Sequence, residues 1–349
     1  MKYSRVYINS MAYQLAPEVV SSKDLESRLA PLYQKLRIPV GQLAALTGIE
    51  ERRWWPTNHR LSDGAIEAAK KSLSETGINV NDIGAVVYTG VCRDQHEPAT
   101  ACRIAAEIGV NKSTAIYDIS NACLGVLSGM LDIANRIELG QIKAGLVVSC
   151  ESARHIVDIT IDNMLSNQSI QNFSQSLATL TGGSGATAIL LTDGTLNLDN
   201  KRQHKLLGAT HLSAPQHHDL CKWGLQEVSL KLYREFMRTN AVPLLKEGVA
   251  LALDTWKHFL GQQKWTIDTV NKVICHQVGS ANQKQVLSTL QIPPEKEYPT
   301  YQHLGNMGTV SLPVTAALAD EKGFLQKGDN VSFLGIGSGL NCMMLGLEW

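Results

Sequence analysis

The sequence lacks features that would assign it to several common protein classes. Its seven cysteines are scattered and include no CxxC pair, which argues against a zinc site or a disulfide framework and indicates a reducing compartment. The formal net charge is zero, so we expect no nucleic-acid-binding surface. No apolar run is long enough to span a membrane, and the N-terminal segment has no long apolar core like that of a signal peptide. We therefore expect a soluble cytoplasmic protein without an integral membrane segment.

What the chain does contain is a large hydrophobic fraction and a repeated order of elements. Hydrophobic residues make up 44% of the 349 residues, enough for a large core. In the first half we expect helices at 63–76 and 100–108 and strands at 83–88, 145–149 and 186–191. The second half repeats this order, with strands expected at 270–275, 331–335 and 342–347. Strands that alternate twice with buried helices predict an α/β fold whose sheets are covered on both faces.

Other stretches do not follow the repeat. Residues 23–36 have the periodicity of an amphipathic helix. Residues 48–56 are rich in charge and contain Trp54 and Trp55. We interpret them as an exposed, solvated turn, and a partner surface formed by the tryptophans is the alternative. Residues 160–180 and 210–262 have no counterpart in the other half and are natural places for a substrate channel.

Cys123 lies where a short apolar strand end gives way to a helix that is apolar nearly all round. Such a helix is expected to be buried, as in a layer between two sheets. The free amides and positive dipole end at a helix N-terminus favour a thiolate, so we predict a lowered pKa for this thiol. A thiolate there suits a covalent nucleophile. The alternative is an inert core cysteine, and position alone does not decide between the two.

Two polar residues of the second half are further candidates. His276 follows an expected buried strand directly, which is where α/β proteins place reactive groups. Asn306 lies between Gly305 and Gly308 at the start of an apolar helix. Taken alone, Asn306 would be interpreted as a helix cap.

The glycine-rich segment 335–339 is not a dinucleotide-binding loop. Position 340 is Leu, so the third glycine of that motif is missing, and too little chain follows for a βαβ unit. We interpret the segment as a turn whose backbone amides approach another site closely.

Four motifs, taken in chain order, resemble those of the thiolase superfamily, and within it the ketoacyl synthase III enzymes with their Cys-His-Asn triad. The motifs are Asn-Ala-Cys at 121–123, Cys-His-Gln at 275–277, Gly-Asn-Met-Gly at 305–308 and Gly-Ile-Gly-Ser-Gly at 335–339. The resemblance implies a five-layered αβαβα sandwich in a homodimer. It also implies two similar halves, residues 1–196 with the nucleophilic Cys and residues 197–349 with the His and Asn.

The same resemblance implies a role for each motif residue. Cys123 would be the acylated nucleophile. His276 and Asn306 would donate hydrogen bonds to the thioester carbonyl of the second substrate. The backbone amides of Cys123 and Ser338 would form the oxyanion hole for the acyl group on Cys123.

A closer resemblance is to the OleA enzymes, head-to-head condensing enzymes that begin bacterial long-chain olefin synthesis. It is carried by residues 89–98 and 337–342. In that group the glutamate matching Glu97 reaches into the active site of the partner subunit. Joining two acyl thioesters without decarboxylation requires a base to remove an α-proton, whereas decarboxylating a malonyl group makes the carbanion without one. Glu97 can be that base, although alone it would be interpreted as a charged loop residue beside a proline.

The sequence also departs from the ketoacyl synthase III pattern. The Trp and Arg that grip the coenzyme A adenine in well-known members are not matched, and Gln42 and Leu46 stand near their place. The position five after the His is usually basic and helps to dock acyl carrier protein, but here it is Ala281. The coenzyme A contacts are therefore unassigned, and a carrier-protein substrate is disfavoured.

We therefore expect an acyltransferase of lipid or olefin biosynthesis that condenses two fatty acyl-CoA thioesters without decarboxylation. Its product would be a 2-alkyl-3-oxoacyl compound formed through an acyl-Cys intermediate. We expect no metal and no cofactor apart from coenzyme A thioesters as substrates. One alternative is a decarboxylating 3-oxoacyl synthase III that uses a malonyl thioester. Another is a non-catalytic partner subunit, but such subunits typically lose the nucleophile.

Overall fold

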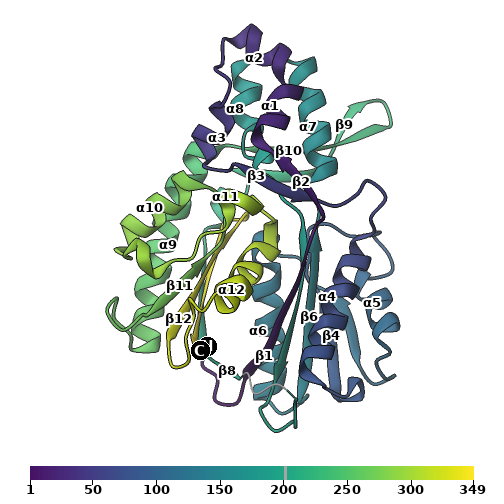
Figure 1. Ribbon diagram of the computed structural model, residues 1–349, viewed down its shortest axis with the longest axis vertical. Helices are drawn as coiled ribbons and strands as arrows, with labels where there is room; N and C mark the ends of the chain where they lie inside the picture. Colours follow the sequence, from purple (N-terminus) through teal and green to yellow (C-terminus); the bar gives the residue numbers. More distant parts are fainter. Residues whose placement is uncertain (200–202) are drawn as a thin grey trace.

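The computed structural model describes residues 1–199 and 203–349 and has a nine-stranded sheet at its centre (Figure 1). The strands run in the order β11-β12-β13-β8-β1-β7-β6-β4-β5. They are β1 (Tyr7–Leu15), β4 (Ile83–Tyr88), β5 (Ala115–Asp118), β6 (Ala144–Glu151), β7 (Gly185–Thr192), β8 (His204–Ser213), β11 (Lys272–Cys275), β12 (Asn330–Gly337) and β13 (Asn341–Glu348). Only Tyr7 and Ile8 of β1 pair with β8, so the sheet consists of two smaller sheets joined at one corner.

Helices cover both faces of each smaller sheet and make five layers. The helices of these layers are α4 (Leu61–Thr76), α5 (Thr100–Ile108), α6 (Gly125–Glu138), α9 (Ala241–Gln263), α10 (Ser280–Leu290) and α12 (Ser311–Glu321). Helices α6 and α12 pack between the two sheets in the largest apolar core (Figure 1). Helices α4 and α5 cover the outer face of one sheet, and α9 and α10 cover the outer face of the other. The expected αβαβα sandwich is confirmed.

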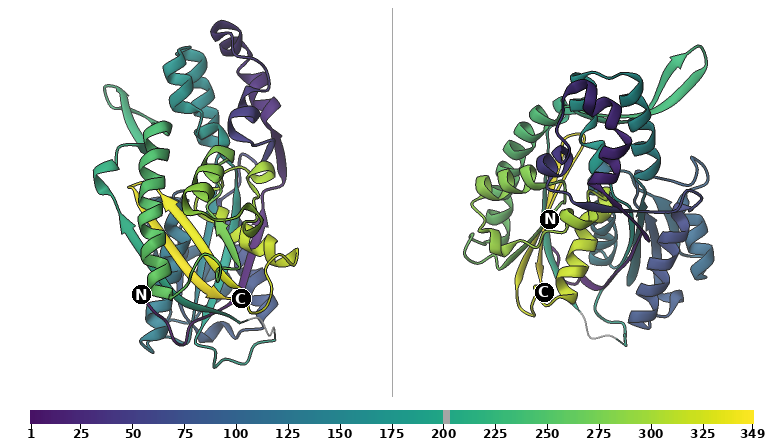
Figure 2. Two further views of the ribbon diagram at one scale, coloured as in Figure 1. Left: turned by 90° about the vertical axis from the view of Figure 1, so that its left-hand side faces the viewer. Right: turned by 45° about the horizontal axis from the view of Figure 1, so that its top comes forward.

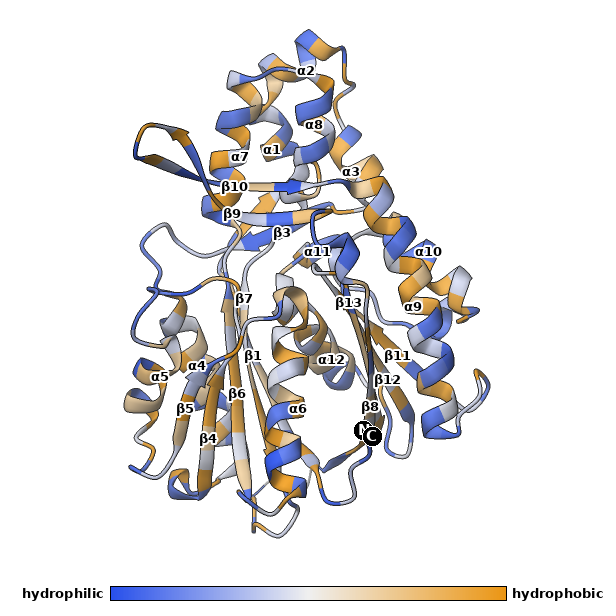
Figure 3. Ribbon diagram, turned by 180° about the vertical axis from the view of Figure 1, so that it is seen from behind, coloured by the Kyte–Doolittle hydropathy of each residue, from blue (hydrophilic) through white to orange (hydrophobic). Residues whose placement is uncertain are grey.

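The strand directions confirm the repeat expected from the sequence. Strand β4 is parallel to β6, which is antiparallel to β7. Strand β11 is likewise parallel to β12, which is antiparallel to β13. These strands are mostly hydrophobic because they are covered on both faces (Figure 3). The expected boundary between residues 196 and 197 falls between β7 and β8 and stays a prediction.

The segments outside the repeat gather at one end of the molecule (Figure 2). They are α1 (Ser22–Arg28), α2 (Ala30–Leu36), α3 (Gln42–Thr47), α7 (Arg154–Ser166), α8 (Ile170–Ser176), the strand pair β2 (Glu18–Ser21) and β3 (Glu51–Trp54), and the hairpin of β9 (Cys221–Ser229) and β10 (Leu232–Thr239). The short helix α11 (Tyr301–Leu304) lies beside β3. An apolar cluster joins α1, α2, α7 and α8 into a cap over this end.

Two expectations for this end were wrong. Residues 48–56 are not an exposed turn, because they contain β3, and Trp54 and Trp55 are each only 3% exposed. Both indoles donate hydrogen bonds to backbone carbonyls, which satisfies their polar atoms in the core. The single helix expected at 23–36 is divided at Leu29, since Pro31 is tolerated only in the first turn of a new helix.

No helix within the described ranges combines the length and apolar character needed to cross a bilayer.

Candidate active site

Cys123 lies in a short 3-10 turn, Ala122–Leu124, between β5 and α6, as the sequence predicted. The preceding Ala122 has φ +44°, a left-handed conformation that residues with a Cβ rarely adopt. The start of α6 is fixed from the other half of the chain, because the amide of Val126 donates to Oγ1 of Thr309 at 2.7 Å. The turn therefore presents Cys123 where the two halves meet.

The predicted lowering of the Cys123 pKa is wrong. Burial raises the pKa of this thiol to about 12, and negative charge on Cys221 and Glu151 adds to the effect. The free energy needed to remove a thiolate from water is larger here than the stabilisation that the amides at the helix start provide. The thiol is therefore protonated at neutral pH and must lose its proton during the attack itself.

His276 follows β11 directly and is 6% exposed. Its amide donates to the carbonyl of Leu334 on the neighbouring β12 at 2.9 Å. Burial lowers the pKa of His276 to about 4, so the imidazole is neutral at physiological pH. Its Nδ1 has no hydrogen-bond partner among the residues described. The residue also lines a largely apolar pocket bounded by α9, α10, β12 and β13.

Asn306 lies in a tightly held turn. Its backbone donates to the carbonyl of Thr181 and accepts from Gly183, at 2.9 and 2.8 Å. Its side-chain Oδ1 accepts from the amide of Gly308 at 3.0 Å. This bond is the local turn expected of a helix-capping Asn. It also directs the Nδ2 group, which donates no hydrogen bond within the residues described, away from the turn.

The glycine-rich segment approaches the nucleophile, as the sequence indicated. A Cβ on Gly337 would lie 3.4 Å from the backbone nitrogen of Cys123, and a Cβ on Gly335 would lie 2.6 Å from the side chain of Leu124. Only glycine allows β12 to come this close. Ser338 is the next residue, so its amide lies beside the Cys123 turn.

The three triad candidates thus come to one region around β12 and the start of α6. Cys123 contacts the end of β12, His276 pairs with the same strand, and Thr309 links the Asn306 turn to α6. No hydrogen bond joins their three side chains within the residues described. Their roles, and the oxyanion role of the Cys123 and Ser338 amides, stay predictions.

Comparison with known proteins agrees with this arrangement. The Thiolase, N-terminal domain family matches residues 44–198, and the 3-Oxoacyl-[acyl-carrier-protein (ACP)] synthase III C terminal family matches residues 260–349. The acyl-CoA:acyl-CoA alkyltransferase of Shewanella oneidensis is 77% identical over 349 residues, with both chains covered completely. The chain belongs to the acyl-CoA:acyl-CoA alkyltransferase family.

Solved structures support the same assignment. A crystal structure of Xanthomonas campestris OleA with a cysteine replaced by alanine is 32% identical and matches with a TM-score of 0.93, covering 100% of this chain and 98% of that chain. Crystal structures of another cysteine variant of that OleA, with bound lauric acid and lauroyl-CoA, match with a TM-score of 0.92 at 32% identity, covering 99% of this chain and 100% of that chain. The expected resemblance to OleA and the thiolase fold is confirmed, and the protein is an acyltransferase.

In this alkyltransferase, no hydrogen bond joins Glu97 to the triad candidates of its own chain within the described ranges. Its side chain is exposed and makes no hydrogen bond or ion pair within the residues described. The segment around it is nevertheless anchored. Asp94 accepts from the amide and hydroxyl of Ser62, and Asp118 accepts from the first amides of α5 at 2.9 and 3.0 Å.

The positions where the alkyltransferase departs from the ketoacyl synthase III pattern lie beside each other. Leu46 is exposed on α3, and Ala281 is exposed at the start of α10. The end of α3 abuts α10, since a Cβ on Gly48 would lie 2.7 Å from Ser280. The coenzyme A contacts remain unassigned.

Sequence analysis missed Thr309 and Glu151. Glu151 ends a buried strand, β6, much as His276 follows one, and that placement was the available signal. Nothing in the local sequence around Thr309 indicates that its hydroxyl holds a helix of the other half.

Proposed function

We propose that the protein joins two fatty acyl-CoA molecules by a non-decarboxylative Claisen condensation in a homodimer. The observation that carries this proposal is the exposed carboxylate of Glu97, which lies on a segment anchored at both ends. The triad candidates of the same chain lie together, so Glu97 is available to the active site of a partner subunit. The printed names of the relatives and the lauroyl-CoA bound to Xanthomonas campestris OleA support acyl-CoA as substrate. Strand β5 supports the dimer, because it is an edge strand with unpaired backbone groups close to the Glu97 segment.

The first half-reaction transfers an acyl group to Cys123. The sulfur attacks the thioester carbon, and the amides of Cys123 and Ser338 stabilise the oxyanion. The bond to coenzyme A breaks, and coenzyme A leaves as the thiol with the proton that Cys123 gives up. Because burial raises the Cys123 pKa to about 12, the sulfur still carries this proton when acyl-CoA binds.

The second half-reaction forms the carbon–carbon bond. The carbonyl oxygen of a second acyl-CoA accepts hydrogen bonds from His276 and Asn306, and Glu97 of the partner subunit removes its α-proton. The carbanion attacks the acyl-Cys carbonyl, the carbon–sulfur bond breaks, and the Cys123 thiolate takes a proton from the partner's Glu97. The product is a 2-alkyl-3-oxoacyl-CoA.

Replacing Glu97 with glutamine tests the proposal, because glutamine keeps the size of the side chain and removes its basicity. We expect Glu97→Gln to retain acylation of Cys123, measured as one acyl mass per chain, and Cys123→Ala to show none. Condensation of two acyl-CoA molecules and exchange of their α-protons with deuterium should both fall sharply. Normal condensation by Glu97→Gln, or condensation only with malonyl-CoA, would instead favour a decarboxylating synthase.

Subunit mixing tests the action across the dimer. A Cys123→Ala chain paired with a Glu97→Gln chain contains one complete site, formed by Cys123 of one chain and Glu97 of the other. Each variant alone should be inactive in condensation, and the mixture should recover part of the activity after subunit exchange. A mixture that stays inactive would place Glu97 outside the partner's site.

A further inference from the structure

Glu151 is a buried carboxylate that the proposed mechanism does not use. It is the last residue of β6 and is 4% exposed. Its oxygens accept hydrogen bonds from the amides of Val91 and Cys92 at 2.9 and 3.2 Å. Within residues 1–199 and 203–349 it forms no ion pair. A buried charge without a counter-charge is costly, so its presence requires an explanation.

The amides that bind Glu151 open the segment that carries Glu97. From Val91 the chain runs through Asp94, which is bonded to Ser62, to Glu97 and then to the start of α5. Glu151 therefore anchors the first end of this segment, together with the hydroxyl of Tyr88, which donates to the carbonyl of Cys92 at 2.6 Å. Asp118 anchors the second end. Glu97 lies between two fixed points.

The side chain of Glu151 also lies against the Asn306 turn. A Cβ on Gly308 would lie 3.4 Å from Cγ of Glu151 and 3.5 Å from its Oε1. The amide of Gly308 is the group that donates to the Asn306 side chain. The carboxylate of Glu151 thus lies in contact with the turn that carries Asn306 and also binds the segment that carries Glu97.

The electrostatic effect of Glu151 on the nucleophile is unfavourable. The titratable groups around it are the hydroxyl of Tyr88 and the thiols of Cys92, Cys123 and Cys150, and its charge contributes to raising the pKa of each. Burial in turn raises the pKa of Glu151 to about 7, against its two backbone hydrogen bonds. A carboxylate kept here at the expense of thiolate formation indicates a benefit at another step.

We propose that Glu151 is a positioning residue for the condensation step, which holds the Val91–Cys92 backbone so that Glu97 reaches the site of the partner subunit. This inference rests on the proposed function. It predicts opposite effects on condensation and on chemical alkylation of the Cys123 thiol, which general damage to the fold does not.

The first test replaces Glu151 with glutamine. The amides of Val91 and Cys92 bind different oxygens of the carboxylate, and glutamine replaces one of these oxygens with an NH2 donor, so one backbone amide would lose its acceptor. We expect condensation to slow by roughly 10- to 100-fold through kcat, as for a displaced catalytic group. Alkylation of Cys123 by iodoacetamide, measured by peptide mass spectrometry at a pH of about 8.5 where Glu151 is ionised, should become faster because a negative charge is removed. Slowing of both reactions, or of neither, would overturn the proposal.

A second variant keeps the proposal testable if Glu151→Gln does not fold. Glu151→Asp keeps the charge but withdraws the carboxylate by one methylene. It should slow condensation while leaving the alkylation rate of Cys123 unchanged. Condensation at the parent rate would overturn the proposal even if Glu151→Gln did not fold.

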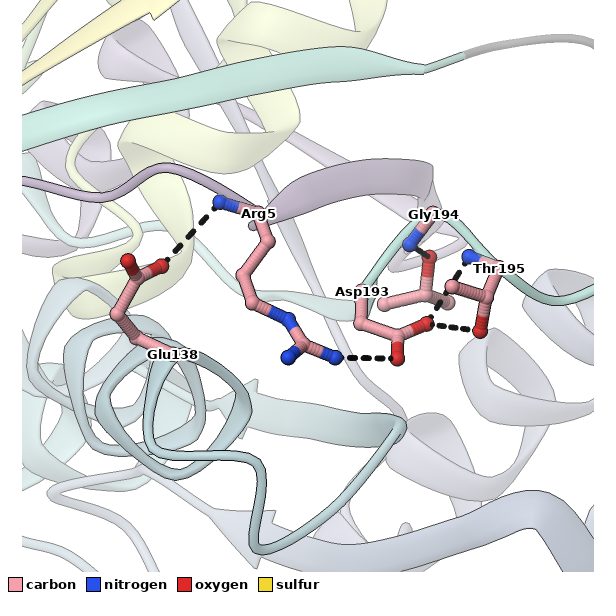
Figure 4. A network of polar contacts seen from close by, with 6 residues as sticks. Arg5, Glu138, Asp193, Gly194 and Thr195 are labelled. Carbon is pink, nitrogen blue, oxygen red and sulfur yellow. Dashed lines mark hydrogen bonds and ion pairs between the residues drawn. The ribbon is translucent and has the colours of Figure 1, made fainter.

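Asp193 provides the matched control. It is a buried carboxylate that follows Thr192, at the opposite end of the β6–β7 pair from Glu151. It pairs with Arg5 at 2.9 Å and accepts hydrogen bonds from Thr195 (Figure 4). Asp193→Asn should lower the melting temperature without changing the ratio of condensation to Cys123 alkylation.

The mixed dimer assigns the effect to one chain. In the mixture of Cys123→Ala and Glu97→Gln chains, Glu151→Gln should reduce the recovered activity only when it is placed on the chain that supplies Glu97. A loss only on the chain that supplies Cys123 would assign Glu151 to the Asn306 turn and overturn the proposal. If the mixture without Glu151→Gln recovers no activity, the proposed action across the dimer fails and this inference fails with it. Recovered activity that Glu151→Gln leaves unchanged on either chain would overturn the inference alone.

Discussion

His276 and Asn306 are expected to act in only one of the two half-reactions. Each would donate a hydrogen bond to the oxygen on which charge develops when the α-proton is removed. Losing one such donor typically costs on the order of 100- to 1000-fold in rate. His276→Ala and Asn306→Ala should therefore still acylate Cys123 but condense slowly. Mass spectrometry of the acyl adduct and product formation under single turnover measure the two steps separately.

The buried imidazole of His276 should make the protein sensitive to acid. Its pKa is about 4 in the folded chain, below its ordinary value of 6.5, so the unfolded chain binds the proton more tightly. The stabilisation is present above pH 6.5 and is lost as the pH falls toward 4. Between pH 7 and pH 5 the parent should lose on the order of 1–2 kcal/mol more stability than His276→Asn. Urea unfolding at the two pH values checks this, and equal losses would contradict it.

At the scale of single residues, the sequence predicted the positions of the candidate residues better than it predicted their protonation states. The strand-to-helix junction placed Cys123 correctly, because that signal is local. The pKa prediction failed because the surrounding fold buries the thiol, and because Cys221 and Glu151, which are distant in the sequence, raise its pKa further through Coulombic interaction.

At the scale of elements, the bond between Thr309 and the start of α6 joins the two halves. Thr309→Val keeps the shape of the side chain but leaves the buried amide of Val126 without an acceptor. This should cost about 1–3 kcal/mol of stability and slow acylation of Cys123. Thr309→Ser, which keeps the hydroxyl, is the control for both measurements. An acylation rate unaffected by valine would show that this bond does not position the nucleophile.

Elements with strong internal periodicity were predicted well. The expected bounds of β4 and α5 agree with the structure residue for residue. The error at residues 48–56 has a different origin. Charged residues beside two tryptophans look exposed in a sequence, but Arg52 is fully buried and donates to the hydroxyl of Ser22 in a neighbouring segment.

At the scale of the whole molecule, the repeat predicted the layers but not how the sheets are joined. Periodicity reports which face of an element is apolar, and this indicated sheets covered on both faces, whereas the five-layered sandwich was implied by the resemblance to the thiolase superfamily. The contact of β1 with β8 involves only Tyr7 and Ile8, and the cap is built from segments without a counterpart in the other half. Neither leaves a periodic pattern that could be recognised.

The proposed dimer has a consequence for the concentration dependence of the two half-reactions. Acylation uses groups of one chain, whereas condensation requires Glu97 of the partner subunit. Dilution below the dimer dissociation constant should therefore reduce condensation per chain and leave acylation unchanged. Stopped-flow and product assays across a dilution series, with sedimentation to follow the mass above 38.1 kDa, measure this. A parallel loss of both reactions would contradict the assignment of acylation to one chain and of condensation to the dimer.

The high pKa of Cys123 also bears on how the nucleophile survives between turnovers. Peroxides oxidise thiolates rather than thiols, so a thiol with a pKa of about 12 offers them almost no target at neutral pH. Exposed Cys102 should be converted to sulfenic acid first when the protein is treated with hydrogen peroxide. The burial that slows thiolate formation thus gives the nucleophile chemical durability, and the enzyme should keep its activity in storage without a reducing agent.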